Sequence, residues 1–236
     1  MKIILSPAKT YNLAPHFKQI IGTEPKYLEH TEIILEALKE LNSDELNKIM
    51  KLSDALLNQT IYNIKHFTNL PVNHAISYYT GFVFKELKRE TYSDKELNYL
   101  NEHLIILSAF YGLLKPFDLV KPYRLDLTMK LPNFSNLTSY WRQLINNEFK
   151  DELIINLASS EFSSLINHPM ITIQFLENKN GVYKNLGTYA KKARGKILNY
   201  LVENKITDIE EIKHFKEDQY QFNKELSNNS NIIFTR

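Results

Sequence analysis

The chain has 236 residues, of which 43% are hydrophobic and 12% aromatic, and its formal net charge is +2. That size suffices for one large domain, and the small net charge excludes a global attraction to nucleic acid, so such binding would need local clusters of cations. The absence of cysteine excludes disulfides, thiol catalysis and cysteine-ligated metal centres. No run approaches the roughly 18 apolar residues of a membrane-spanning helix, so we expect a soluble, cytoplasmic protein without membrane contacts.

The N-terminal third predicts one strand followed by a helical annex. Residues 2–5 form a short apolar run that indicates a buried strand, and Pro7 ends it. Residues 24–70 carry apolar side chains at helical spacing, with Ser43 and Ser53 as expected N-caps.

The middle of the chain predicts strands at 75–79 and 104–107, separated by helices at 81–90 and 93–103. Ser93 and Glu96 fit a capping box at the start of the second helix. The segment 107–127 then combines two prolines, two tyrosines and two aspartates, which predicts an irregular, functional connection at the end of a sheet.

The last part of the chain predicts a mixed sheet. Helices are expected at 138–149, at 190–203 and after Thr207 with a Thr207–Glu210 capping box, and strands at 153–157, 171–176, 182–186 and 232–235. Asn180-Gly181 is typical of a hairpin turn between two of these strands. The prediction is an α/β fold, a mixed sheet flanked by helices, organised as a single domain over residues 1–236.

Small or hydroxyl residues follow four of the predicted strands. Because ligands bind outside the carboxyl ends of strands in open α/β sheets, these residues predict a pocket for phosphate or another small anionic ligand. Capping of the following helices by the same serines is the alternative. The candidate pocket residues are Ser6, Thr10, Thr80, Lys85, Ser108, Tyr111, Asp118 and Ser159, with Lys9 and Arg124 as neighbouring cations. Arg124 is expected to bind either a phosphate or Asp118.

The densest basic cluster is the run YAKKARGK, which has four cations within six positions: Lys191, Lys192, Arg194 and Lys196. Such a helix suits contacts with the phosphates of DNA or RNA. The turn at 204–206 and the short helix after it give the outline of a helix-hairpin-helix clamp, although the turn lacks glycine. A solvent-exposed helix face is the alternative.

No motif indicates a metal, a cofactor or a catalytic residue. The seven histidines include no HExxH, and the single Glu211-x-x-His214 spacing is one of the two that a four-helix di-iron site requires. No GxGxxG, Walker loop or GxSxG is present. We therefore expect no resident metal ion and no cofactor.

Six separated motifs resemble the YaaA family of bacterial peroxide-stress proteins, in order and in spacing. They are ILSPAKT, YYTGFVFKEL, LSAFYGLLKPFDLVKPYRLDL, INLASSEF, YAKKARGK and IIFTR. The resemblance implies a cytosolic protein that protects against hydrogen peroxide, limits damage from unincorporated iron and binds double-stranded or branched DNA. It also implies an α/β fold with a basic cleft and a helix-hairpin-helix element near the C-terminus. The DNA-binding residues would be Lys9, Lys115, Arg124, Lys191, Lys192, Arg194 and Lys196.

Two functions follow from these observations. The first is a DNA-binding module that holds phosphates in a basic cleft. The second is an enzyme that acts on a nucleotide or a nucleic-acid base at the strand-end pocket, which requires Lys9, Tyr111, Asp118 and Arg124 to converge. The residues show no iron site, so any effect on iron is expected to be indirect. The sequence leaves the oligomeric state open.

Overall fold

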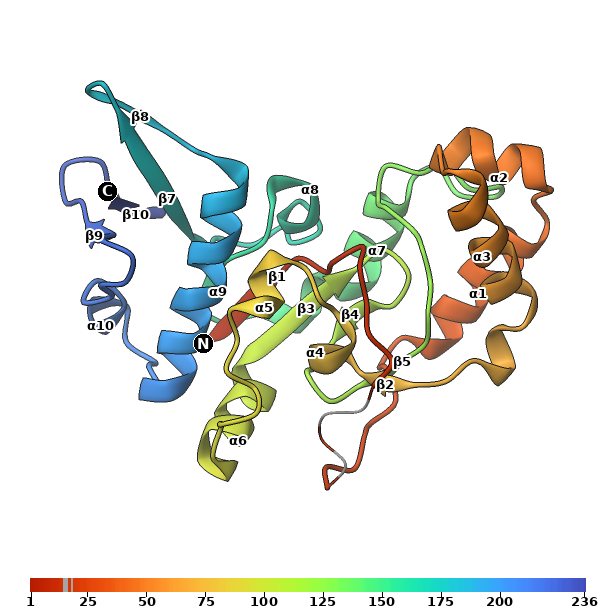
Figure 1. Cartoon of the computed structure of the whole chain (residues 1–236), viewed down its shortest axis with the longest axis horizontal. Coiled ribbons are helices and arrows are strands. Elements are labelled where there is room, and N and C mark those ends of the chain that lie inside the picture. Colours follow the sequence, from red (N-terminus) through yellow and green to blue (C-terminus); the bar gives the residue numbers. More distant parts are fainter. Residues whose placement is uncertain (15–16, 18) are drawn as a thin grey trace.

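A computed structural model of the chain describes residues 1–14, 17 and 19–236, and it shows a mixed sheet flanked by helices (Figure 1). The strands are β1 (Lys2–Leu5), β2 (Asn73–His74), β3 (Leu104–Ser108), β4 (Gly112–Leu114), β5 (Leu119–Val120), β6 (Ile154–Asn156), β7 (Ile171–Lys179), β8 (Val182–Lys184), β9 (Gln221–Phe222) and β10 (Asn231–Thr235). The helices are α1 (Leu28–Lys39), α2 (Ser43–Met50), α3 (Asp54–Lys65), α4 (Ala75–Tyr78), α5 (Phe82–Lys85), α6 (Asp94–His103), α7 (Leu137–Ile145), α8 (Ser160–Ser163), α9 (Gly187–Asn204) and α10 (Ile209–Ile212). The predicted α/β class is confirmed.

The order of the main sheet is β4-β3-β1-β6-β7-β10-β9, with β8 paired to β7. Five neighbouring strands, β3, β1, β6, β7 and β10, are parallel. In chain order these five strands run 2-1-3-4-5, so the chain changes direction across the sheet between β1 and β6. In open parallel sheets a ligand crevice forms at such a switch point, outside the carboxyl ends of the strands.

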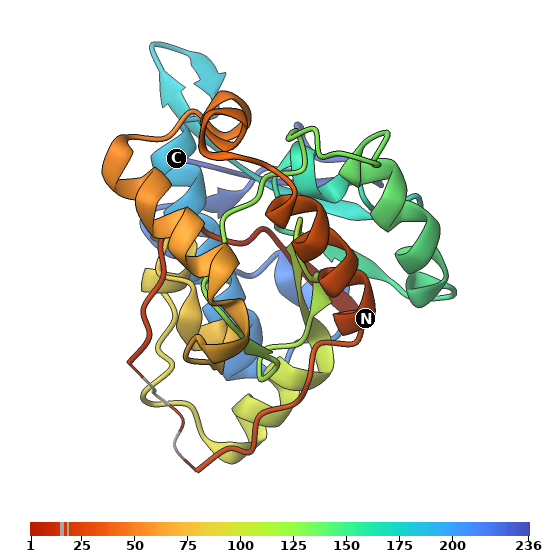
Figure 2. The same cartoon turned by 90° about the vertical axis from the view of Figure 1, so that its right-hand side faces the viewer.

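The central strands are mostly apolar and buried. Ile3, Ile4 and Leu5 of β1 are completely buried. Strands covered on both sides read as continuous apolar runs, which is why β1 and β3 were predicted correctly. Helices α1, α2 and α3 lie at one end of the molecule and the β7–β8 hairpin at the other (Figure 1), and Figure 2 looks onto the helical end with the hairpin visible above it.

The edge strand β4 is fixed against α7 by Trp141. Its indole Nε1 donates a hydrogen bond to the carbonyl of Ala109 at 2.8 Å. Gly112 has a φ of +72°, and a Cβ there would lie 2.6 Å from the Trp141 ring. Only glycine satisfies both the positive φ and the close approach of the indole.

Two predictions about the segments around the loop 107–127 were wrong. Residues 75–79 do not form a strand: α4 occupies Ala75–Tyr78, and the amide of Ala75 donates to the carbonyl of Asp118 at 2.8 Å. A short buried helical turn and a short buried strand have the same apolar pattern, so periodicity could not separate them. The loop itself is less irregular than expected, because it contains β4 and β5.

The predicted helix caps were partly right. The Ser93–Glu96 capping box is present, and Asn180 and Gly181 form the β7–β8 turn with positive φ. Asn42 caps α2 in place of Ser43, Ser53 precedes α3 without a side-chain cap bond, and Asp208 caps α10 in place of Thr207. Adjacent polar residues compete for one cap, and the backbone decides which of them accepts the first amides.

A candidate nucleic-acid binding groove

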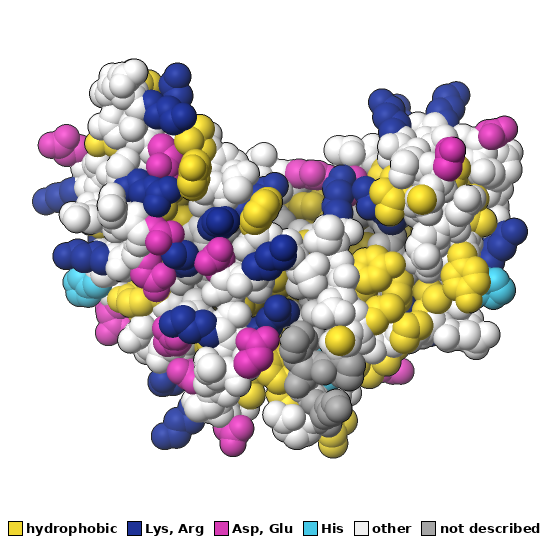
Figure 3. All heavy atoms as spheres, viewed as in Figure 1, with side chains coloured by type: hydrophobic (Ala, Val, Ile, Leu, Met, Phe, Trp, Pro, Cys, Tyr) yellow, Lys and Arg dark blue, Asp and Glu magenta, His cyan; other side chains and the backbone are white. Residues whose placement is uncertain are grey.

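Two adjoining hollows lie at the carboxyl ends of β1 and β6, at the switch point of the sheet. The larger has a volume of about 620 Å³ and the smaller about 90 Å³, and both are lined by the loop after β1 and by α8. Figure 3 shows the same edge of the molecule hollowed between the β7–β8 hairpin and helices α1–α3, with Lys and Arg side chains along it. We call the two hollows together the groove.

Hydrogen bonds between strand ends hold the floor of the groove. The hydroxyl of Ser6, after β1, accepts the amide of Ser159 at 2.8 Å and lies 3.2 Å from the Ser159 hydroxyl. The amide of Thr80 donates to the carbonyl of Thr10 at 3.0 Å. A Cβ on Gly81 would lie 2.8 Å from the Ala8 Cβ, so glycine allows these two loops to pack closely.

Helix α9 supplies two of its four predicted cations to the groove. Lys191 and Arg194, which are one turn apart, line the larger hollow together with Lys85 of α5. Lys192 is exposed outside it, and Lys196 forms an ion pair with Asp218 at 2.7 Å. The four cations therefore do not form one surface, because their positions spread around the helix.

Arg194 is the most unusual cation of the groove. Its Nε is buried without a hydrogen-bond partner, and the side chain makes no ion pair with any residue that the structure describes. Burial lowers the pKa of this guanidinium, since the charged form loses hydration. Arginine keeps its charge at neutral pH, so the groove contains a desolvated cation without a counter-ion among the described residues.

The smaller hollow contains a second set of charges. Lys9 pairs with Asp126 at 2.6 Å, and Arg124 lines the same hollow without an ion pair among the described residues. Over both hollows the described lining residues include five cations and two carboxylates, Asp126 and Glu161. The groove is therefore locally basic although the whole chain is nearly neutral.

Three predicted pocket residues lie outside the groove: Ser108, Tyr111 and Asp118 are buried and hold the loop 107–127 together. The Ser108 hydroxyl accepts the amide of Tyr111 at 3.0 Å, and the Tyr111 hydroxyl accepts the amide of Lys121 at 2.9 Å. The hydroxyls of Ser108 and Tyr111 therefore stabilise the loop through hydrogen bonds to its own backbone.

Asp118 connects the same loop to the N-terminal segment through hydrogen bonds. Its two carboxylate oxygens accept the hydroxyl of Thr23 at 2.6 Å and the amide of Lys115 at 2.8 Å, and burial raises its pKa. The alternative Arg124–Asp118 pair is not formed in the described structure. The side chain of Lys115 is exposed and lies outside both hollows.

The geometry required for the enzyme hypothesis is not met. Lys9 and Arg124 share the smaller hollow, whereas Tyr111 and Asp118 are buried elsewhere. Ser6 bonds to Ser159, and Lys9 bonds to Asp126, so these two residues do not form a nucleophile–base pair. We therefore assign no catalytic residue.

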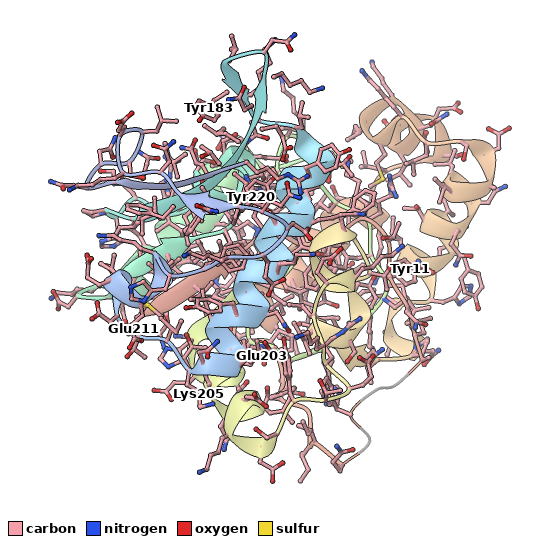
Figure 4. The ribbon with its side chains drawn as sticks, turned by 60° about the vertical axis from the view of Figure 1, so that its left-hand side comes forward. Tyr11, Tyr183, Glu203, Lys205, Glu211 and Tyr220 are labelled. Atoms are coloured by element: carbon pink, nitrogen blue, oxygen red, sulfur yellow. The ribbon has the colours of Figure 1, made fainter. Side chains whose placement is uncertain are left out.

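The predicted helix-hairpin-helix clamp gains no support from the geometry. The second helix, α10, is a single turn, and the amides of Lys205 and Ile206 donate to carbonyls of α9. These amides are therefore not free for a phosphate. Lys205 lies at the end of α9 away from the hairpin that carries Tyr183 (Figure 4), about 20 Å along the helix from Lys191.

The groove residues that sequence reasoning missed include two phenylalanines and two carboxylates: Phe82, Phe162, Asp126 and Glu161. Phe82 follows Gly81 directly, so its place beside the predicted pocket could have been read from the YYTGFVFKEL motif. The two carboxylates gave no signal, because an acidic residue in a loop has many possible partners.

The described part of the chain contains neither a metal-binding cluster nor a helix that could span a membrane. Across 1–14, 17 and 19–236, no three or more His, Cys, Asp or Glu side chains come together in a group that could hold a metal ion. In the same part of the chain, the helices are too short or too polar to cross a lipid bilayer.

Comparison with known proteins agrees with the resemblance of the motifs. Residues 1–226 match the family described as peroxide stress protein YaaA. A UPF0246 protein of Fusobacterium nucleatum is 45% identical over 100% of this chain and 99% of its own length. UPF0246 proteins of Francisella philomiragia and Clostridium botulinum are each 35% identical, over 100% of this chain and 100% and 99% of their own lengths. With motifs, fold and full-length similarity in agreement, this chain belongs to the peroxide stress protein YaaA family.

Proposed function

We propose that the protein acts in peroxide stress by binding DNA through the groove, and that phosphate contacts supply most of the affinity. The observation that carries this proposal is a set of four groove cations without an ion pair among the described residues: Lys85, Arg124, Lys191 and Arg194. A polyanion would neutralise these charges together, which is how nonspecific DNA binding arises.

The position of the cations also supports a nucleic acid. They come from α5, from the loop after β5 and from α9, so they are spread along two adjoining hollows. A nucleic-acid strand carries several phosphates, so cations in two adjoining hollows suit it better than one isolated phosphate. Bound protein would shield the DNA from oxidation by peroxide and unincorporated iron. This protection does not require the protein to hold iron.

Binding to labelled duplex and branched DNA tests the proposal. The double variant Lys85→Ala/Lys191→Ala removes two exposed cations that line the groove. Its matched control, Lys192→Ala/Lys216→Ala, removes two exposed cations that line neither hollow and form no ion pair in the described structure. Both variants lose the same charge.

We expect the groove variant to bind DNA at least tenfold more weakly than wild type at moderate salt, because two phosphate contacts are lost. The control should stay within about twofold. Equal losses in the two variants would show that overall charge, and not the groove, attracts the DNA. No binding by wild type at moderate salt would overturn the proposal.

A further inference from the structure

The larger hollow contains an aromatic side chain that phosphate binding does not require. Phe82 lines it from α5 and is 46% exposed, whereas each of the other twelve phenylalanines is buried or half-buried. An exposed phenylalanine in a pocket is a surface on which a planar ring can stack.

The rest of the wall continues this apolar surface. Phe84 and Phe162 are almost completely buried and line the same hollow, together with Val83 and Leu157. These apolar side chains would add no affinity for a phosphate alone. A ligand with both an apolar ring and an anionic group would use the whole pocket.

The anionic group has a defined place in the same hollow. Arg194 lines it with a buried Nε that lacks a partner, and Lys191 stands one turn earlier on α9. The hydroxyls of Ser6 and Ser159 lie at the strand ends nearby. A planar guanidinium without a counter-ion matches the oxygens of a phosphate.

The volume of the larger hollow and its place in the sheet both suit a ligand with a ring and an anionic group. A volume of about 620 Å³ falls within the range of pockets that bind small molecules. The pocket also lies where the chain changes direction between β1 and β6, which is where parallel sheets bind nucleotides.

We propose that the larger hollow binds a single nucleotide, with its base against Phe82 and its phosphate on Arg194 and Lys191. This inference rests on the proposed DNA binding when the nucleotide belongs to a strand. The same chemistry would also recognise a free nucleotide. In DNA the preferred target would be an unpaired nucleotide, since a base inside the stack cannot reach the pocket.

The test compares three duplexes of one sequence: fully paired, with one unpaired deoxyadenosine, and with an abasic residue in place of that deoxyadenosine. The two bulged duplexes share the same backbone flexibility and differ in the base. Calorimetry with free deoxyadenosine monophosphate forms a separate arm. The variants are Phe82→Ala and Arg194→Gln, and Tyr62→Ala removes a comparably exposed aromatic residue on α3, outside the groove.

We expect the base-bearing bulge to bind wild type about tenfold more tightly than the abasic bulge, as stacking of one base provides. Phe82→Ala should remove this difference and leave binding of the paired duplex within about twofold. Arg194→Gln should weaken every DNA, and Tyr62→Ala should change nothing. Unfolding midpoints verify that the variants fold.

The outcomes separate this inference from the proposed function. If wild type binds the paired duplex but neither prefers the base-bearing bulge nor binds the free nucleotide, the nucleotide pocket is wrong and DNA binding stands. A preference that survives in Phe82→Ala also overturns the pocket. If no DNA binds but the free nucleotide does, with an affinity that Phe82→Ala reduces, the pocket stands and the proposed function fails. If nothing binds, both fail.

Discussion

At the scale of single residues, Arg194 combines a cost to folding with a use in binding. Its Nε is buried without a hydrogen bond, which destabilises the folded state relative to an apolar side chain of similar size. Arg194 also lines the larger hollow, and residues of functional sites often reduce the stability of the fold.

Arg194→Met should therefore raise the free energy of unfolding by about 1 kcal/mol, since it removes a desolvated charge and keeps the side-chain volume. Chemical denaturation measures this. Arg142→Met is the matched control and should be destabilising, because both Nε and Nη2 of Arg142 donate to the carbonyl of Ser164. A loss of stability in Arg194→Met would mean that the guanidinium has a structural partner.

His74 makes folding sensitive to acid. It packs edge-on against Phe117 with ring centroids 5.9 Å apart, its Nε2 is buried without a partner, and burial lowers its pKa. The unfolded chain therefore binds a proton more readily than the folded protein does. The stabilisation by neutral His74 is complete above the ordinary pKa of about 6.5 and is lost as the pH falls through the lowered, folded-state value.

Wild type should consequently lose stability relative to His74→Phe as the pH falls below about 6.5, by at most about 1.4 kcal/mol per pH unit. Denaturant titrations between about pH 5 and about pH 8 measure the difference. His214→Gln, at an exposed histidine, should follow the wild-type curve. Parallel curves for wild type and His74→Phe would show that His74 titrates normally.

At the scale of elements, the contact between α5 and α9 determines where the groove cations lie. Gly195 makes this contact possible: a Cβ there would lie 2.3 Å from the carbonyl oxygen of Val83 and 2.8 Å from the Cβ of Glu86. Lys85 and Arg194 lie on the two sides of this contact, so its spacing determines their separation.

Gly195→Ala should reduce the free energy of unfolding by about 1–3 kcal/mol, because the clash with a backbone atom exceeds the better helix propensity of alanine. It should also weaken DNA binding. Gly187→Ala on the same helix is the control, since a Cβ there meets open space and should be neutral or slightly stabilising. A stabilised Gly195→Ala would mean that α5 moves aside freely.

At the scale of the whole molecule, the protein has a net charge of only +2, yet its groove is basic. Attraction at long range is therefore weak, and affinity depends on contacts made inside the groove. The number of those contacts can be measured, because each neutralised phosphate releases counterions.

With four cations free of ion pairs among the described residues, the logarithm of the duplex-binding constant should fall with the logarithm of salt concentration at a slope of about −3.6. Lys85→Ala/Lys191→Ala should reduce the magnitude by about 1.8, and Lys192→Ala/Lys216→Ala should leave it unchanged. Fluorescence anisotropy over a salt series gives the slopes. A much steeper wild-type slope would show that DNA also contacts cations outside the groove, such as Lys115 or Lys192.

The fold class, most helices and strands, and the family could all be predicted from the amino-acid sequence. Buried parallel strands such as β1 and β3 need continuous apolar runs, and the Asn180-Gly181 turn needs residues that accept positive φ. The local sequence is therefore enough to predict these features. The convergence of Ser6, Thr80, Lys85 and Ser159 also followed from the rule that ligands bind at strand ends.

The sequence could not predict which polar residues form hydrogen bonds inside the loop and which line the groove, because this depends on tertiary packing. Ser108, Tyr111 and Asp118 have the same side-chain chemistry as site residues, but buried amides of the loop 107–127 required acceptors, and these side chains supply them. The division of the α9 cations likewise depends on segments distant in sequence: Lys196 pairs with Asp218, whereas the Nε of Arg194 has no partner among the described residues. The residue type limits which groups a side chain can bind, whereas tertiary packing determines which of those groups lies beside it.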